Sequence, residues 1–381
     1  MIYFDNNATT QIAPEVCETM RPFLEASFGN PSSAYAAGRE TRVAIESARA
    51  SVAALLGSEP AEIVFTSGGT ESDNWAIRGA LKLDASKRHI VTTRVEHEAV
   101  RKLCEELEGD GYSVTWLDVD EDGLLDLGRL RESLQPDTAI VSVMLANNET
   151  GVLFPVKEIG GIVHKGSDAL FHVDAVNAVG KIPIDLSDGA IDLLSLSAHK
   201  FHGPKGVGAL YIRNGIRLPS ASIGGGQESG RRAGTEAVHQ IAGLGAAAEL
   251  VRDMSTMETV RRLRDKIENA ILSDIPGSYL NGSSEKRLPN TSNISFENLN
   301  GEMILAALDD VGICVSTGSA CHAGNHTASP VLQAMNVPYS RAMGSIRFSL
   351  GRYNTEEEVD RVISEVKKIV PVLQKLGSET A

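Results

Sequence analysis

The chain has 381 residues, 42% of them hydrophobic and 23% charged, which is typical of a globular protein with about two domains. A formal net charge of −14 disfavours nucleic acids and anionic membrane surfaces as partners, because an acidic surface repels phosphate groups. The four cysteines lack CxxC or zinc-finger spacing, and neither a secretory signal nor a membrane-length apolar run is found, so a cytoplasmic protein is expected.

Apolar runs alternate with helical segments through the first two thirds of the chain. Runs of this length between helices predict a mostly parallel sheet with helices on both faces. A helix is predicted at 71–81. Strands are predicted at 62–67, 89–93, 113–117, 138–145, 170–174, 193–198 and 208–212.

The pattern changes after about Ala247. A long amphipathic helix is predicted at 257–272, followed by short strands at 293–296 and 345–350. A last helix is predicted from Glu356 to about Leu376. This α+β pattern predicts a second domain. We expect a large domain at 13–257, and a small domain made of 1–12 and 258–381 that carries Cys321.

The sequence SGGT at residues 67–70 joins a predicted strand to a predicted helix. Two glycines permit a tight turn, and a helix N-terminus offers N–H groups and a positive dipole end to a phosphate. Gly69 and Thr70 are therefore candidate phosphate-binding residues. The alternative is an ordinary helix start with Thr70 as N-cap, and the turn taken alone favours that alternative.

Lys200 directly follows a predicted buried strand and precedes a loop with the sequence FHGPKG. A lysine at the mouth of a sheet can lose its proton through desolvation or a nearby cation, and the free amine can then attack an aldehyde cofactor. Ser197 and His199 flank it as possible phosphate donors. The alternative is a solvated loop lysine, which most lysines are.

Asp174 and His97 also follow predicted strands, at the edge where open α/β sheets bind ligands. An aspartate there can keep a pyridinium nitrogen protonated, which makes the ring a better electron sink. A histidine can stack on a flat ring or move protons. Each residue can instead cap the next helix. For Asp174 alone the cap is favoured, and for His97 the two interpretations are comparably supported.

Cys321 lies in GSACHAGNHTASP, where glycines and small residues predict a mobile, exposed loop. An exposed thiol near basic groups tends to be reactive. His322 and His326 are close in sequence, but a zinc site usually needs four organised ligands, so no metal is expected. The other three cysteines lie in helical or apolar runs and are interpreted as structural.

Each of these signals is weak alone, but together with further motifs they cover nearly the whole chain. The chain resembles the NifS/IscS-type cysteine desulfurases, which are class V, fold-type I pyridoxal-phosphate enzymes. The motifs that carry the resemblance are YFDNNATT (3–10), FGNPSS (28–33), TSGGTESDN (66–74), EHEAV (96–100), NNETG (147–151), HVDAVNAVGKIPID (172–185), SLSAHKFHGPKGVGALY (195–211), GGGQ, RRAGT, RLPNTSNISF, STGSAC and GSIRFSLGRYNTEEEVD.

The resemblance implies an α/β, fold-type I transferase with a large domain, whose mostly parallel sheet is flanked by helices, and a smaller α+β domain. It implies removal of sulfur from L-cysteine with pyridoxal 5′-phosphate, giving L-alanine and a persulfide on Cys321. Lys200 would hold the cofactor as a Schiff base and then act as acid and base at the substrate α-carbon. The persulfide would pass to a sulfur-acceptor protein, for iron–sulfur cluster assembly or tRNA thiolation.

The resemblance also implies a homodimer, because Thr235 in RRAGT would reach the phosphate bound by the other subunit. Other positions are implied to contact the cofactor or the substrate carboxylate. They are Asp174 at the pyridine nitrogen, His97 stacked on the ring, Thr70, Ser197 and His199 at the phosphate, Gly69 and Asn177 among the cofactor contacts, and Asn148 and Arg347 at the substrate.

The chain departs from the family pattern at Asn177, where a glutamine usually hydrogen-bonds the phenolic oxygen of the cofactor. Asparagine is one methylene shorter, so this contact is expected to be lost or bridged by water. Ser229 in GGGQESG and Ala237 in GTEA replace the usual arginine and asparagine. Both changes affect contacts expected near the phosphate of the dimer partner.

Two alternative functions remain open. The segment CHAGNHTASPVL also resembles selenocysteine lyases, so a selenocysteine lyase or another class V β-lyase or aminotransferase is the nearest alternative. A simple aminotransferase would not need Cys321. The alternative from another class is a catalytically silent assembly scaffold, which the presence of Lys200, Asp174, His97 and Cys321 disfavours.

Overall fold

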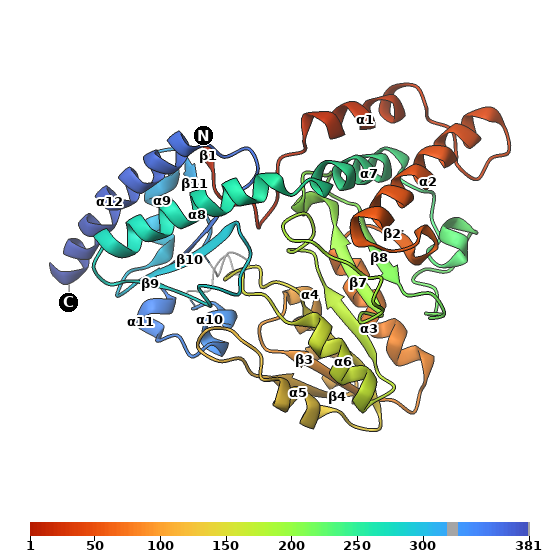
Figure 1. The fold of residues 1–381 in the computed structure, drawn as a ribbon, viewed down its shortest axis with the longest axis horizontal. Helices are drawn as coiled ribbons and strands as arrows, with labels where there is room; N and C mark the ends of the chain where they lie inside the picture. Colours follow the sequence, from red (N-terminus) through yellow and green to blue (C-terminus); the bar gives the residue numbers. More distant parts are fainter. Residues whose placement is uncertain (318–326, 380–381) are drawn as a thin grey trace.

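The computed structural model describes residues 1–317 and 327–379, and within them one part is centred on a seven-stranded sheet (Figure 1). The sheet order is β2-β8-β7-β6-β5-β3-β4, and neighbouring strands are parallel except that β8 runs antiparallel to β2 and β7. The predicted mostly parallel sheet is confirmed. Its strands are β2 (Ile63–Thr66), β3 (His89–Thr93), β4 (Ser113–Leu117), β5 (Thr138–Met144), β6 (Leu170–Asp174), β7 (Leu193–Ser197) and β8 (Gly208–Ile212).

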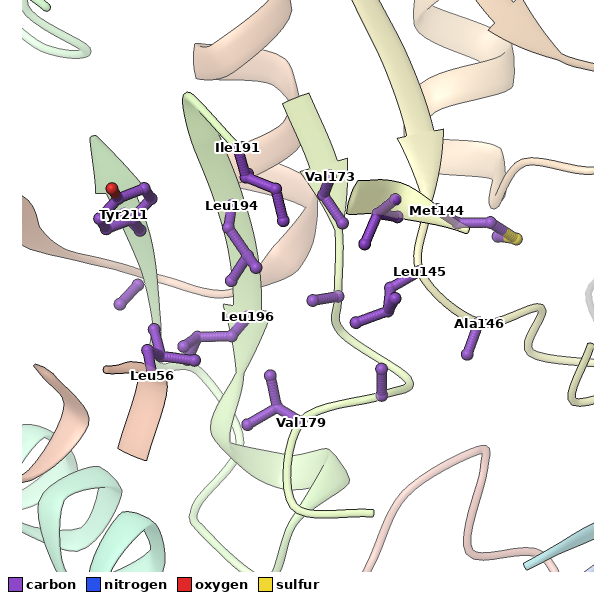
Figure 2. Close-up of a cluster of buried hydrophobic side chains, with 14 of the residues drawn as sticks. Leu56, Met144, Leu145, Ala146, Val173, Val179, Ile191, Leu194, Leu196 and Tyr211 are labelled. Carbon is purple, nitrogen blue, oxygen red and sulfur yellow. The ribbon is translucent and has the colours of Figure 1, made fainter. Parts of the chain in front are cut away.

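Helices cover both faces of this sheet, which is why all residues of β5 and β7 are buried. On one face, Val64 and Ile90 pack with residues of α3 (Gly69–Leu83) and α4 (Glu98–Gly109). On the other face, the core includes Leu194 and Tyr211 (Figure 2). Its helices are α1 (Pro14–Glu25), α2 (Ala36–Leu56), α5 (Leu127–Ser133), α6 (Val156–Gly166) and α7 (Val238–Arg252).

The remaining elements form a second part with its own core. The sheet order there is β12-β10-β9, all antiparallel, and β1 pairs with β11 in a parallel two-stranded sheet. The two long helices α8 and α12 lie along this part beside the N-terminus (Figure 1). The elements are β1 (Ile2–Tyr3), α8 (Ser255–Asp274), β9 (Ser278–Leu280), β10 (Thr291–Phe296), α9 (Gly301–Asp309), β11 (Ile313–Cys314), α10 (Pro330–Ala334), α11 (Tyr339–Ala342), β12 (Ser345–Ser349) and α12 (Glu356–Glu379).

The N-terminal segment connects the two parts. Phe4 is fully buried in the core of the second part. A few residues later, the backbone N–H of Thr10 donates to the carbonyl oxygen of His199 at 2.8 Å, and the N–H of Ala13 donates to that of His202 at 3.0 Å. The segment between Phe4 and Thr10 therefore crosses from the second part to the loop that follows β7.

Among the described residues, no helix is both long and apolar enough to cross a bilayer. The cysteines interpreted as structural differ from one another. Cys104 is buried in α4, Cys314 is half-buried in β11, and Cys17 on α1 is exposed. The structural interpretation is therefore wrong for Cys17, because the helix turns that position toward solvent.

Candidate active site

A cavity of about 400 Å³ lies at the carboxyl ends of β5, β6 and β7. Parallel sheets bind ligands at this edge, and the volume is in the range of small-molecule sites. The N-terminal segment and β12 complete the wall through Asp5, Asn7 and Arg347. The predicted site residues that line this cavity are Gly69, Thr70, His97, Asn148, Asp174, Asn177, Ser197, His199, Lys200 and Arg347.

Lys200 ends the single 3₁₀ turn, η2 (Ala198–Lys200), that follows β7. Its Nζ donates to the backbone carbonyl oxygens of Asn7, at 2.5 Å, and of Ala8, at 3.0 Å. The side chain is half-buried. Lys200 is therefore held in the cavity wall by the N-terminal segment, unlike a lysine in a solvated loop.

Two buried aspartates, Asp73 and Asp174, line the wall of this cavity. Asp174 ends β6, and its Oδ1 accepts from the N–H of Val176 at 2.9 Å. Burial raises the pKa of Asp174, and the charges of His97 and Lys200 oppose that rise. Burial and the charge of Asp174 raise the pKa of Asp73 well above its ordinary value. Burial and the charge of Asp174 therefore both oppose ionisation of Asp73.

His97 both caps a helix and lines the cavity. It is the N-cap of α4, where its Nδ1 accepts from the N–H of Ala99 at 3.1 Å. Desolvation lowers the pKa of His97, although Asp174 opposes the shift. A neutral ring that accepts at Nδ1 carries its proton on Nε2. The capping interpretation and a place in the cavity are thus compatible for His97.

Two glycines, Gly68 and Gly69, lie at the turn into α3. Gly68 is the N-cap, with φ of +148°, so α3 begins at Gly69 and the prediction of Thr70 as N-cap is wrong. Thr70 instead lies in the exposed first turn. A Cβ on Gly69 would lie 2.6 Å from Cγ2 of Val176, so a larger residue would not fit. Gly69 and Thr70 line the cavity, so the N-terminus of α3 lies in its wall.

Ser197 ends β7 beside this turn, and His199 lies in η2, where its Nδ1 is 3.1 Å from Oγ1 of Thr9. A Cβ built on Gly68 would lie 3.5 Å from Oγ of Ser197, which places this hydroxyl next to the turn. Burial and the charges of Lys200, Lys205 and Lys181 lower the pKa of His199 to about 4. His199 is therefore neutral at pH 7, and its ring can still donate one hydrogen bond.

Arg347 lies in β12 and is buried. Its Nη1 donates to the carbonyl oxygen of Asn148 at 2.9 Å, and its Nη2 donates to Oδ1 of Asp5 at 2.6 Å. Nε is buried and has no partner among the described residues. The guanidinium of this cavity-lining residue is thus oriented by two contacts.

Asn177 is engaged by protein groups on both sides of its amide. Its Oδ1 accepts from Nζ of Lys181 at 2.7 Å, and its Nδ2 donates to the carbonyl oxygen of Asn147 at 3.3 Å. Asn177 is buried but still contributes to the cavity wall. A carboxamide has two N–H donors and two lone pairs, so Asn177 can bind a ligand while it keeps both contacts.

Some predicted residues lie elsewhere. Cys321, His322 and His326 lie outside the described residues, whereas Thr317 and Pro330, on either side of them, line the cavity. Thr235 is exposed and is not among the described residues that line the cavity of its own chain.

Sequence reasoning missed several buried carboxyl groups in the wall. Oε1 of Glu96 accepts from Oγ1 of Thr93 at 2.8 Å and from the N–H of Met144 at 3.0 Å, and burial raises the pKa of Glu96 to about 8. Glu149 accepts from Oγ of Ser329 at 2.5 Å, and burial raises its pKa to about 7. The missed signal was an acidic residue inside a short motif directly after a buried strand.

The donor set fits pyridoxal 5′-phosphate. The N-terminus of α3, Ser197 and neutral His199 line the cavity and suit a phosphate. Lys200 and Asp174 share the same cavity. Asp73 lines it too, and its buried Oδ1 has no hydrogen-bond partner among the described residues, although Nε2 of His172 lies 3.6 Å away.

Comparisons with known proteins agree with this geometry. The family described as "Aminotransferase class-V" matches residues 2–362. "Cysteine desulfurase" of Trichormus azollae is 52% identical over 379 residues, covering 99% of this chain and 94% of the relative. "Cysteine desulfurase NifS" of Azotobacter vinelandii is 50% identical with the same coverage. A solved "NIFS-LIKE PROTEIN" superposes with a TM-score of 0.92 at 40% identity, covering 98% of this chain and 100% of that chain.

Proposed function

Since the chain belongs to the class-V aminotransferase family and, within it, to the NifS/IscS-type cysteine desulfurases, we propose that it takes sulfur from L-cysteine with Lys200 as the cofactor lysine and Cys321 as the sulfur acceptor. The observation that carries the proposal is that Lys200, Asp174 and His97 line one cavity. Three groups of complementary chemistry at the carboxyl edge of the sheet suit a planar, phosphorylated aldehyde cofactor.

Pyridoxal 5′-phosphate, when bound, supplies an electron sink for charge that develops at the substrate α-carbon. The N-terminus of α3, Thr70, Ser197 and neutral His199 would hold its phosphate. Asp174 would hold a proton on the ring nitrogen, and His97 would cover one face of the ring. Lys200 would remove and return a proton at the α-carbon. Gly69, Asn148 and Asn177 would complete the binding wall.

Arg347 is the proposed binding group for the substrate carboxylate, together with Asn148. A guanidinium that is already oriented by two neighbours loses little freedom when a carboxylate binds. This favours an α-amino acid such as L-cysteine over a substrate without a carboxylate.

The proposed sulfur transfer balances as a displacement at sulfur. The thiolate of Cys321 forms an S–S bond with the cysteine sulfur, the Cβ–S bond breaks, and the electron pair stays with the carbon. That carbon then takes up a proton, which gives L-alanine and a persulfide on Cys321. The persulfide sulfur would pass to an acceptor protein, such as an iron–sulfur scaffold or a tRNA-thiolation protein.

We further propose a cytoplasmic homodimer in which Thr235 contributes to the partner's phosphate site. Thr235 is exposed, and so are the large apolar side chains of Phe28, Tyr35 and Ile223, which are 89%, 61% and 98% exposed. Burial of such side chains against a second copy would be favourable. The mass of the protein in solution tests this assignment.

We propose the domain division at 13–257, against 1–12 with 258–381. Ile2 and Phe4 share a buried cluster with Val260 and Val370, which supports grouping the first residues with the C-terminal part. The N-terminal segment then crosses the active site between the two domains.

The test is alanine formation from L-cysteine by the wild type and by Cys321→Ser. Alanine from the wild type alone supports the proposal and its nucleophile. Equal alanine from both proteins favours a β-lyase that does not need Cys321. A wild type that acts only on L-selenocysteine is a selenocysteine lyase, and one that neither binds the cofactor nor turns over either substrate is a scaffold.

A further inference from the structure

Lys181 is a buried lysine to which the proposed function gives no role. It lies in the turn after β6, is 7% exposed, and donates from Nζ to Oδ1 of Asn177 at 2.7 Å and to Oδ1 of Asn7 at 3.0 Å. Lysines are rarely buried this deeply without a partner carboxylate. Among the described residues, Nζ donates to these two amide oxygens, so Lys181 holds two asparagines in place.

Asn7 is the point at which this lysine meets the active site. The backbone oxygen of Asn7 accepts from Nζ of Lys200 at 2.5 Å. Its Nδ2 donates to the carbonyl oxygen of Asn148 at 3.2 Å and to Oγ1 of Thr291 at 2.9 Å. Its Oδ1 also accepts from Nδ2 of Asn290 at 3.0 Å. Asn7 therefore joins the N-terminal segment to both parts of the molecule.

The same network reaches the substrate side of the cavity. The carbonyl oxygen of Asn148 that accepts from Asn7 also accepts from Nη1 of Arg347 at 2.9 Å. Behind the active site, a small cavity of about 20 Å³ is lined by both Lys181 and Lys200. Lys181 thus contacts Asn7, whose backbone oxygen binds the cofactor lysine Lys200. The side chain of Asn7 binds the same Asn148 carbonyl oxygen as the substrate arginine Arg347.

Lys181 acts on its neighbours through hydrogen bonds. Burial lowers the pKa of Lys181 well below its ordinary value, and the charges of Lys200 and Arg347 lower it further. Nζ carries at least two N–H donors in either protonation state, and these donate to the oxygens of Asn7 and Asn177. The contact with Asn7 therefore does not depend on the charge of Lys181.

We propose that Lys181 is a positioning residue, which fixes Asn7 over the cavity so that the cofactor lysine Lys200 and the substrate arginine Arg347 are held in register. This inference rests on the proposed function, because it takes Lys200 and Arg347 as the cofactor and substrate groups. Asn177 then has a second role, because it anchors Lys181 to the large domain.

The test compares holoenzymes of the wild type, Lys181→Met and Lys157→Met. Methionine keeps the length of the side chain but removes its donors. Lys157 is an exposed lysine paired with Asp188 on the surface and serves as the matched control. The measurements are amide hydrogen exchange of the peptide 3–11, release of pyridoxal 5′-phosphate on dilution, and KM and kcat for L-cysteine.

Loss of the contact should speed exchange in the peptide 3–11 and raise both the cofactor dissociation constant and KM by roughly tenfold, the size expected for one or two buried hydrogen bonds. Lys157→Met should match the wild type. Exchange, cofactor release and KM of Lys181→Met that all match the wild type would overturn the proposal. So would faster exchange throughout the chain with unchanged cofactor release and KM, since that pattern indicates a purely structural lysine.

If Lys181→Met does not fold, Asn7→Ala replaces it, because it removes the acceptor while Lys181 keeps Asn177. Unchanged cofactor release and KM in that variant would overturn the proposal equally. Hydrogen exchange and cofactor release need no turnover. A wild type that binds cofactor but makes no alanine would therefore refute the proposed function, while these two measurements still decide the role of Lys181.

Discussion

Asp5 and Arg347 form an ion pair in the wall of the cavity, with Oδ1 of Asp5 2.6 Å from Nη2 of Arg347. Asp5 follows the first strand of the chain and Arg347 lies in its last strand, so the pair joins both ends of the sequence at the site. Asp5 orients the guanidinium, while the buried Nε has no hydrogen-bond partner among the described residues.

We expect Arg347→Lys to lower kcat/KM for L-cysteine by about 30-fold or more, mainly through KM. A lysine keeps the charge but loses the planar, oriented set of donors, and a charge-assisted hydrogen bond contributes about 1.5–3 kcal/mol. L-Cysteine methyl ester, which lacks the carboxylate, provides the control substrate. Equal losses with the acid and the ester would show that Arg347 does not recognise the carboxylate.

The loop GGGQESG is held by a buried ion pair between Arg49 and Glu228. Both carboxylate oxygens accept from the guanidinium at 2.8 Å, and Oε2 also accepts from the N–H of Phe65 at 2.9 Å. Glu228→Gln should lower the free energy of unfolding by about 3 kcal/mol, because it leaves the buried Arg49 charge without its main partner. Denaturant unfolding measures this change.

Glu46 provides the matched control for that measurement, because it binds the same arginine from the surface. Its side chain is 59% exposed. Glu46→Gln should cost less than about 1 kcal/mol, as exposed ion pairs usually do. Comparable losses from the two variants would mean that burial of Glu228 does not strengthen its contact.

Periodicity predicted the main sheet well, because its signal is local. Its strands end within one residue of prediction, and the parallel topology explains why Asp174 and Lys200 meet after being predicted separately. The start of α3 was misplaced because the sequence did not reveal that Gly68 adopts a φ of +148°. Glycine permits this φ angle, but the presence of a glycine in the sequence does not predict that the angle is adopted.

The contacts of Asn7 could not be predicted in the same way. Asn7 lies 174 positions from Lys181 and 193 from Lys200 in the sequence. Hydrophobic periodicity and capping preferences describe neighbours within a few turns, so they give no register for such distant contacts. The family motif 3–10 identified the segment, but only the fold shows that it lies across the cavity.

Asn177→Gln should raise cofactor affinity a fewfold and raise alanine formation with it. The present amide is engaged by Lys181 and by the Asn147 carbonyl, whose bond is long at 3.3 Å. Glutamine keeps the carboxamide and adds one methylene, which lets the amide nitrogen reach further into the cavity. Unchanged cofactor release and turnover would mean that the shorter side chain of asparagine loses no cofactor contact. Asn177→Ala is the comparison variant, because it removes the contacts with Lys181 and with Asn147.

The stability of the protein should depend on pH through Glu96. Burial raises the pKa of Glu96 from 4.5 to about 8, so the folded state holds a proton that the unfolded chain releases. This contribution is complete below pH 4.5 and is lost as the pH rises through about 8. Relative to Glu96→Gln, the wild type should therefore lose up to about 4 kcal/mol of unfolding free energy between pH 5 and pH 9.

Glutamine tests this dependence closely, because its carbonyl oxygen can accept from Thr93 and Met144 as Oε1 does. Glu132→Gln changes an exposed carboxylate on α5 and controls for the loss of one negative charge. Denaturant unfolding at several pH values gives the comparison. A wild type that tracks Glu96→Gln across the whole range would show that Glu96 ionises in the folded protein as easily as in water, and that its burial costs nothing.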